Sequence, residues 1–214
     1  INSLREDYGP TIGNVDDILL FTSKRNLKYV AGERVVNEDL FFSLTMPGGY
    51  WGKAQEFTTI NTSYNEGSAC LSQDGKQLFF SRCNSPGSLG NCDLYVSSLG
   101  PDSVWSASKN LGATINSTGW DSHPSLTHTG DTLYFANGHP LNFGEFDIYK
   151  SYFRNGSWVE PRNIGPLVNG GGSEYYFTID SESKSLYYAR SVEEDINNLD
   201  LYSFPVPMGA QPEA

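Results

Sequence analysis

Residues 121–165 read DSHPSLTHTGDTLYFANGHPLNFGEFDIYKSYFRNGSWVEPRNIG, and they contain one complete structural repeat. Runs of β-branched and aromatic residues alternate in this stretch with turn signals such as Thr129-Gly130 and Asn155-Gly156. No part of it has a sustained helical period. The stretch predicts four short strands, at residues 123–127, 132–137, 146–153 and 157–165.

The features of this stretch recur along the whole chain. An Asp-apolar-aromatic triplet begins at steps of 54, 54 and 53 residues, at Asp39, Asp93, Asp147 and Asp200. A tryptophan follows each of the first three triplets, at Trp51, Trp105 and Trp158. Four repeats are therefore visible, and a period of this length indicates equivalent units that hide apolar surface against one another.

The second strand of every repeat has three successive apolar residues: Leu19-Leu20-Phe21, Leu78-Phe79-Phe80, Leu133-Tyr134-Phe135 and Leu186-Tyr187-Tyr188. A half-exposed strand would alternate, so both faces of these strands should be covered. This favours an all-β fold, a β-propeller of four-stranded antiparallel blades that is either four-bladed or part of a larger propeller. A two-sheet sandwich is the alternative, but it gives no reason for such regular recurrence. We expect the propeller over 1–204 and a Pro/Ala-rich exit linker over 205–214.

Charge limits the partners that the chain can have. The 214 residues include 14 Lys and Arg against 25 Asp and Glu, a formal net charge of −11. Nucleic acid and anionic membrane surfaces would be repelled, and no apolar run is long enough for direct insertion into a membrane. Cationic, neutral and carbohydrate partners remain open.

One motif within residues 121–165 is specific enough to suggest a family. It reads acid-x-x-Pro-x-Leu-x-x-x-Gly-x-x-Leu-Tyr-Phe, then Asp-Ile-Tyr, then Trp-x-x-Pro-x-Asn-apolar-Gly. It resembles the WD-repeat-like propeller repeat of TolB-type proteins, in particular the version in Bacteroidetes envelope proteins that carry an OmpA-like peptidoglycan-binding domain. The resemblance covers residues 1–204, with Ala69 and Tyr176 standing where proline is expected. It implies a periplasmic or outer-membrane-associated scaffold, bound to an envelope protein or to a carbohydrate- or peptidoglycan-linked assembly.

The repeated Asp and Trp are best interpreted as structural. Asp93 and its equivalents begin the third strand, where a carboxylate can accept hydrogen bonds from backbone N–H groups of an adjacent turn. The tryptophan of the next strand should bury a large apolar face.

A second set of acids leads into the first strand of each repeat and has two interpretations. In a propeller these acids lie near one mouth of the central channel; they are Asp7, Glu66, Asp121 and Glu174. Each acid either caps its own turn, or the set binds a cation or a ligand that carries an amine or hydroxyl. Calcium would suit such an oxygen-rich set better than zinc. Nearby Trp120, His123 and Tyr175 could add a stacking surface and a titrating group.

Catalysis has little support in the sequence. The three histidines lack metal-ligand spacing, and no Gly-x-Ser-x-Gly or phosphate-binding loop is present. An acid at the same place in every repeat indicates a shared structural duty rather than two differentiated catalytic roles. We therefore expect a non-enzymatic binding or scaffold propeller. The alternatives are a carbohydrate-active propeller enzyme, either hydrolase or lyase, and a calcium-dependent carbohydrate-binding module.

The cysteines and the loops bear on compartment and partners. Cys70 should be a buried thiol, whereas Cys83 and Cys92 flank a short loop between antiparallel strands and are candidates for a disulfide. Such a bridge would place the protein outside the cytoplasm. The loops between second and third strands differ most, and 24–38 is basic, so this face is either solvated surface or a protein-binding surface.

Overall fold

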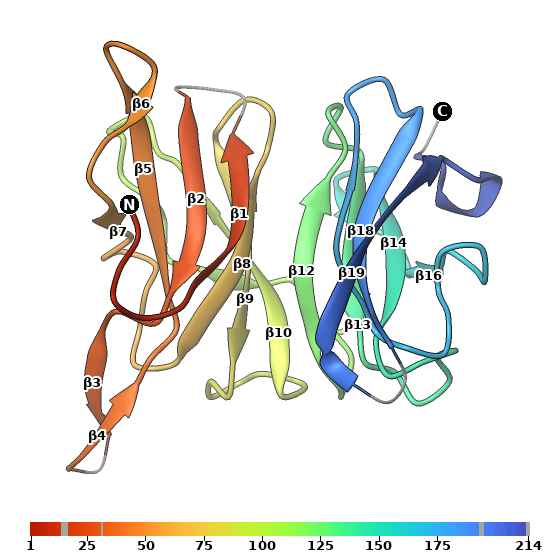
Figure 1. Cartoon of the computed structure of the whole chain (residues 1–214), viewed down its shortest axis with the longest axis horizontal. Coiled ribbons are helices and arrows are strands. Elements are labelled where there is room, and N and C mark those ends of the chain that lie inside the picture. The colour runs from red at the N-terminus through yellow and green to blue at the C-terminus, as the bar shows by residue number, and fades with distance from the viewer. Residues whose placement is uncertain (14–16, 31, 193–194, 213–214) are drawn as a thin grey trace. The chain divides into compact units, whose positions relative to one another are not determined.

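The computed structural model describes residues 1–13, 17–30, 32–192 and 195–212 (Figure 1). Its regular structure is β-strand apart from one 3₁₀ turn at Met208–Ala210. The strands form four small antiparallel sheets and one separate hairpin. These four sheets are the blades of a β-propeller, which confirms the predicted fold class.

The strands fall into blades in chain order. Blade 1 contains β1 (Asp7–Gly13), β2 (Ile18–Ser23), β5 (Asp39–Met46), β6 (Tyr50–Trp51) and β7 (Gln55–Glu56). Blade 2 contains β8 (Asn65–Leu71), β9 (Gln77–Cys83), β10 (Cys92–Ser98) and β11 (Lys109–Asn110). Blade 3 contains β12 (Asp121–Leu126), β13 (Thr132–Asn137), β14 (Asp147–Arg154), β15 (Ser157–Trp158) and β16 (Arg162–Asn163). Blade 4 contains β17 (Glu174–Ile179), β18 (Ser185–Val192) and β19 (Asp195–Pro205), and the hairpin pairs β3 (Leu27–Val30) with β4 (Glu33–Val36).

The outer edge of the blades differs from the prediction. Instead of one strand over 157–165, blade 3 has β15 paired with one end of β14 and β16 paired with its middle. Of the three residues between them, Val159 still donates its N–H to the Tyr152 carbonyl of β14, but the Val159 carbonyl accepts the hydroxyl of Ser151. Pro161 has no N–H to donate, so regular pairing stops before β16. Blade 4 has three strands among its described residues, and no tryptophan follows its third-strand Asp200.

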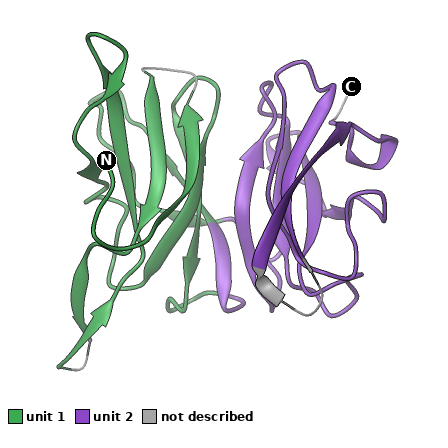
Figure 2. Cartoon of the chain, in the orientation of Figure 1, with its two compact units in different colours: residues 1–88, 95–110 green, residues 89–94, 111–214 purple. Residues whose placement is uncertain are grey.

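The chain divides into two compact units, drawn in green and purple in Figure 2. Unit 1 comprises Ile1–Ser88 and Tyr95–Asn110, and unit 2 comprises Leu89–Leu94 and Leu111–Ala214. In unit 1, β8 packs against β1, β2 and β5. The apolar residues that fill this interface come from both blades and include Leu20, Leu40, Phe57, Ile60, Leu78 and Phe80. Sheets with apolar residues on facing sides are thereby held face to face.

Unit 2 has two apolar clusters. The larger cluster lies where β17 packs against β12, β13 and β14, and its members include Tyr134, Ile148, Ile164, Phe177, Leu186 and Tyr188. The smaller cluster contains Leu94, Ile115, Leu133 and Phe135. The middle strand β13 is buried at every position, so both of its faces are covered. In β18, by contrast, Tyr187 is 47% exposed, so the prediction that both faces of the second strand are covered is wrong at this residue.

Some of the C-terminal residues that the sequence predicts to form a linker pack within unit 2. Ala210 is fully buried in the larger cluster, and its carbonyl accepts the hydroxyl of Tyr134 at 2.6 Å. The ammonium of Lys150 donates to the Gln211 carbonyl at 2.6 Å. That the chain continues from here as an exit linker stays a prediction.

Candidate functional site

The first strand of each blade has one of the acids that the sequence singles out at its first or second residue. The acid lies directly opposite the residue sixteen positions later on the second strand; the pairs are Asp7 and Ser23, Glu66 and Arg82, Asp121 and Asn137, and Glu174 and Arg190. Each carboxylate also accepts the backbone N–H four residues earlier, from Ser3, Thr62, Ser117 and Gly170. One side chain thus holds the incoming turn against the first strand. That the four acids share one channel mouth stays a prediction.

A bulge follows each acid in the first strand. The residue two positions after the acid has a left-handed backbone, with φ of 60° at Gly9, 51° at Ser68, 54° at His123 and 55° at Tyr176. The strand register shifts at these residues in all four blades. Only one of the four residues is a glycine, so the sequence carries little signal for this feature.

In blades 2 and 4 the residue opposite the acid is an arginine. Arg82 Nε donates to Glu66 at 2.7 Å, and Arg190 Nε donates to Glu174 at 2.6 Å. Both carboxylates are fully buried, and burial raises their pKa although the arginine hydrogen bonds oppose this effect.

In blade 1 an arginine also binds the first-strand acid, but it comes from a different position on the chain. Arg25 lies two residues beyond the position that faces Asp7, and its Nη2 donates to that carboxylate at 2.7 Å. Burial of Asp7 opposes ionisation, but hydrogen bonds from Ser23 and Arg25 outweigh it and lower the pKa of Asp7 to about 2.

Blade 3 has no arginine at this position. Asn137 Nδ2 donates to Asp121 at 2.5 Å, and Ser117 N–H donates to the same carboxylate at 2.6 Å. Asp121 is fully buried, and this burial raises its pKa to about 6. In the described part of the chain no lysine or arginine pairs with it.

The predicted aromatic residues of unit 2 lie in one connected row. His123 contacts the ring of Tyr175 at 5.3 Å, and Phe146 links Tyr175 at 5.3 Å to Trp120 at 6.3 Å. Tyr176, which sequence reasoning did not single out for a site, meets the ring of His123 edge-on at 4.4 Å. Burial lowers the pKa of His123 to about 4, so its ring is neutral at pH 7. The row ends in exposed rings at both sides, with Trp120 44% and Tyr176 37% exposed.

The repeated third-strand acids behave differently from blade to blade. Asp93 accepts the N–H groups of Leu89 and Gly90 at 2.8 and 3.0 Å, and Asp147 accepts two N–H groups of its own preceding turn. Asp39 instead binds side chains at 2.7 to 2.8 Å, from Asn26, Lys28 and Asn37. Asp200 is exposed, in contrast with the other three.

The tryptophans that follow these acids are half-buried. Trp105 packs on the core of unit 1 and meets the Phe57 ring edge-on at 6.3 Å. Trp158 packs on the smaller cluster of unit 2, and its ring lies 5.1 Å from that of Phe153. Trp51 pairs across the sheet with Thr45.

The sequence also repeats an asparagine whose role becomes clear only in the structure. Asn61, Asn116 and Asn169 each accept the N–H and donate to the C=O of one residue, which is Leu40, Leu94 and Ile148 respectively. The six distances lie between 2.7 and 3.1 Å. The amide therefore acts as a substitute for one residue of an outer strand.

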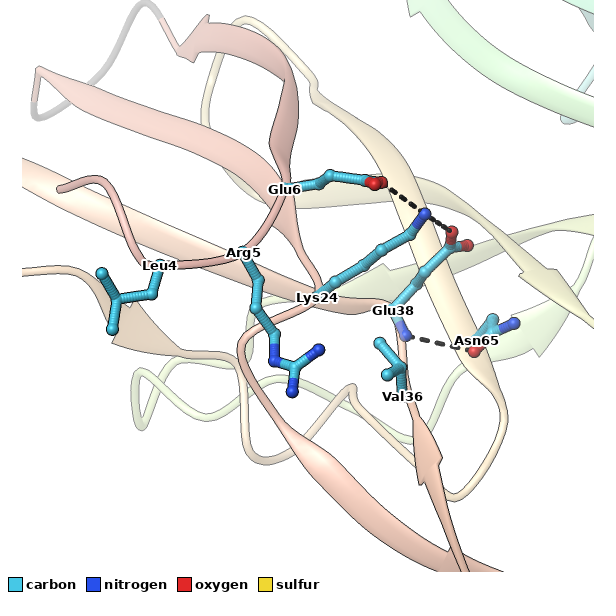
Figure 3. Close-up of a pocket in the computed structure, with 7 residues that line it drawn as sticks. All are labelled: Leu4, Arg5, Glu6, Lys24, Val36, Glu38 and Asn65. Carbon is cyan, nitrogen blue, oxygen red and sulfur yellow. Dashed lines mark hydrogen bonds and ion pairs between the residues drawn. The ribbon is translucent and has the colours of Figure 1, made fainter.

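A pocket in unit 1 lies outside the sequence predictions (Figure 3). Its volume is about 780 Å³, and Lys24 Nζ lies in it between Glu6 Oε2 at 2.6 Å and Glu38 Oε1 at 3.6 Å. The hydrogen bond that Lys24 donates to Glu6 raises the pKa of Lys24. Lys24 is one of the cations of the basic loop 24–38, so this charge is neutralised within the blade.

The three cysteines consist of one disulfide pair and one further residue. Cys83 and Cys92 form a disulfide, as predicted, and Cys70 is buried and lies outside this disulfide. Structural disulfides are typical of proteins outside the cytoplasm.

Within the described ranges, no group of three or more His, Cys, Asp or Glu is arranged to hold a metal ion. Over the same ranges, none of the helical segments has the length and apolar character to cross a membrane.

Comparison with known proteins supports the fold. No protein-family model matches the chain, and no curated protein sequence matches it. Among solved structures, TolB from Acinetobacter baumannii is similar with a TM-score of 0.60 and 14% identity, over 96% of this chain and 42% of that protein. The α-L-arabinofuranosidase from Lactobacillus brevis gives 0.60 and 13%, over 93% and 72%. A protein described as TolB from Agrobacterium tumefaciens gives 0.57 and 15%, over 98% and 80%. The chain thus has TolB-type propellers among its structural neighbours, together with a glycoside-cleaving enzyme.

Proposed function

We propose that the chain is a non-enzymatic binding platform of the cell envelope. The observation that carries this proposal is that every first-strand acid is bonded within its own blade. Glycoside hydrolysis needs two carboxylates in different protonation states on either side of an open position. Here the side chains of Glu66 and Glu174 are fully buried against arginines, and Asp7 is 12% exposed and likewise paired. These acids stabilise turns, and this structural role is what we expect of a scaffold protein.

The aromatic row of unit 2 is the surface that we propose for the partner. It consists of Trp120, Phe146, Tyr175, His123 and Tyr176. Exposed aromatic rings with little conformational freedom are typical centres of protein interfaces. The TolB-type fold and the disulfide support a periplasmic location, and we propose outer-membrane association from the OmpA-type resemblance of the repeat.

Hydrolase assays test the non-enzymatic part of the proposal. Purified chain should not turn over aryl arabinofuranosides or plant and bacterial polysaccharides, while Glu174→Gln should lower the melting temperature. Turnover by the native chain that disappears in Asp121→Asn, with the fold retained, would show that the chain is an enzyme.

Binding assays test the surface. Trp120→Ala should weaken cross-linking to solubilised envelope proteins or co-sedimentation with peptidoglycan sacculi about tenfold, because a large aromatic residue that is a binding hot spot contributes more than 1 kcal/mol. Tyr29→Ala removes a ring that is 76% exposed on the β3–β4 hairpin and serves as the control. Equal losses in both variants would contradict the assignment of the surface.

The second candidate is a carbohydrate-binding or carbohydrate-active propeller. The same aromatic row favours it, because flat apolar rings can stack on a sugar, and the arabinofuranosidase shows that such a fold occurs in an enzyme of this class. A calcium-dependent form of this function predicts a melting temperature that rises with added calcium. An unchanged melting temperature at millimolar calcium would count against that form.

A further inference from the structure

Three blades use an arginine in the same way. Its guanidinium lies 2.6 to 2.7 Å from the first-strand acid, in the pairs Arg25 with Asp7, Arg82 with Glu66 and Arg190 with Glu174. It lies over the aromatic ring that follows the third-strand Asp, with centroid distances of 4.5, 4.7 and 5.2 Å to Phe41, Tyr95 and Tyr202. It also donates to a carbonyl of the incoming turn, at Ile1, Ile60 and Val168. Acid, ring and carbonyl thus form a guanidinium site within each of these blades.

Blade 3 keeps the three groups but not the arginine. The equivalent acid is Asp121, the equivalent ring is Tyr149, and the equivalent carbonyl belongs to Ile115. Asn137 stands where Arg82 and Arg190 stand in their blades. A pocket of about 370 Å³ lies here, lined by Ile115, Asn137 and Tyr149, with exposed residues such as His139 and Glu160 around it. The pocket therefore takes up the space that an arginine side chain fills in the other blades.

One residue that lines the pocket has a buried polar atom without a partner. Asn137 is only 5% exposed, and its Oδ1 has no hydrogen-bond partner. Above about pH 6 the carboxyl of Asp121 is ionised and can only accept, so it faces Nδ2 and leaves Oδ1 without a donor. A buried acceptor without a donor is costly. A ligand that brings an N–H donor would remove this cost.

The charge at the pocket is negative. No cation of the described chain pairs with Asp121, which lies directly behind the Asn137 amide. Glu160 adds a second carboxylate, and the described lining residues include no lysine or arginine. A cation is therefore favoured over a neutral donor, and the Tyr149 ring favours a planar cation that can stack on it.

We propose that the blade 3 pocket, lined by Asn137, Ile115 and Tyr149 in front of Asp121, binds a guanidinium group supplied from outside the blade. The group is carried either by an arginine side chain of a peptide or by a small arginine-like molecule. The guanidinium donates to Asn137 Oδ1 and to the Ile115 carbonyl, and its plane stacks on Tyr149. This binding goes beyond the platform role proposed above, since a hydrolase with the same blade would also have the pocket.

Three small probes of similar size test the chemistry: ethylguanidinium, ethylammonium and neutral ethylurea. In an NMR titration of the whole chain, ethylguanidinium should bind at least about tenfold more tightly than the other two, because it alone combines charge with a planar donor set. Asn137→Arg places the chain's own guanidinium in the pocket and should abolish this binding. Equal binding of ethylurea, or equal binding of ethylguanidinium by the native chain and Asn137→Arg, would overturn the proposal.

A second variant covers the case in which Asn137→Arg does not fold. Asp121→Asn keeps the side-chain shape and removes the charge, so it should weaken ethylguanidinium binding at least about fivefold without unfolding the chain. Acetyl-Gly-Arg-Gly-amide, compared with its citrulline counterpart, then distinguishes the sources. Tighter binding of the arginine peptide than of ethylguanidinium indicates a peptide, and weaker binding indicates a small molecule. Failure of both to bind above the level of citrulline would overturn the proposal, whatever the hydrolase and sacculus assays show.

Discussion

Among the buried first-strand acids, Asp121 is the one whose burial is not offset by a positively charged partner. Glu66 and Glu174 are equally buried, but each has an arginine whose hydrogen bond offsets part of the cost of burying a charge. Asp121 has only neutral donors, from Ser117 and Asn137. Its pKa therefore rises from the ordinary 3.8 to about 6, which makes its charge a cost to the folded state at neutral pH.

This imbalance predicts a specific dependence of stability on pH. A carboxyl with a raised pKa in the folded state binds its proton more tightly there, so its stabilising contribution is present below about pH 4 and is lost as the pH rises through about 6. Asp121→Asn should therefore gain about 2 to 3 kcal/mol in unfolding free energy over the native chain between pH 4 and pH 7. Urea titrations at four pH values measure this gain. Glu182→Gln, at an exposed site, is the control, and parallel pH curves for native chain and Asp121→Asn would contradict the prediction.

The arginine of blade 4 gives the complementary residue-scale prediction. Arg190→Gln removes the ion pair and leaves Glu174 buried without a cation, which should cost about 3 kcal/mol. Adding Glu174→Gln should restore part of the loss, because no buried charge then remains. Urea unfolding of the two single variants and the double variant gives the coupling energy. If the double variant were less stable than Arg190→Gln by the full cost of Glu174→Gln, the pair would not be coupled.

At the scale of the strand, the repeated asparagine substitutes for a missing outer-strand residue. Asn169 is 1% exposed and satisfies both backbone groups of Ile148. Asn169→Ala should lower the unfolding free energy by about 1 to 3 kcal/mol, because the buried N–H of Ile148 loses its partner, whereas the Ile148 carbonyl keeps the N–H of Ile164 at 3.2 Å. Asn169→Asp keeps the acceptor for the Ile148 N–H, but it sets a buried carboxylate oxygen against the Ile148 carbonyl and Asn163 Oδ1 and should cost at least as much. Exposed Asn91→Ala is the control, and similar losses in Asn169→Ala and Asn91→Ala, measured by urea unfolding, would contradict this role.

The elements also show what the sequence could predict and what it could not. Recurring triplets and continuous apolar strands were enough for the propeller, because they report burial on two faces. The outer strand was wrong, since its pairing depends on the Ser151 hydroxyl and on Pro161 rather than on a periodic pattern. The same aligned position holds Arg82, Asn137 and Arg190, so the gap in blade 3 was visible in the sequence. Its meaning was not, because Arg25 reaches Asp7 from two residues further along.

At the scale of the whole molecule, the excess of acidic residues matters more than the basic loop 24–38. Three of the four cations in the basic loop 24–38 bind acids of blade 1, in the pairs Lys24 with Glu6, Arg25 with Asp7 and Lys28 with Asp39. The loop therefore offers little free positive charge, and the net charge of −11 dominates encounters. A cationic partner fits this molecule better than nucleic acid does.

The disulfide affects the stability of the whole molecule and also indicates the compartment in which the protein resides. Cys83 and Cys92 close a loop of about ten residues between β9 and β10, which should contribute about 2 to 3 kcal/mol by restricting the unfolded chain. Reduction, or the Cys83→Ser/Cys92→Ser pair, should then lower the melting temperature by roughly 5–10 °C, whereas Cys70→Ala tests the buried thiol separately. In protein isolated from its native cells, alkylation followed by mass spectrometry should modify these two cysteines only after reduction. If both were alkylated without reductant, the chain would reside in a reducing compartment and the proposed envelope location would be wrong.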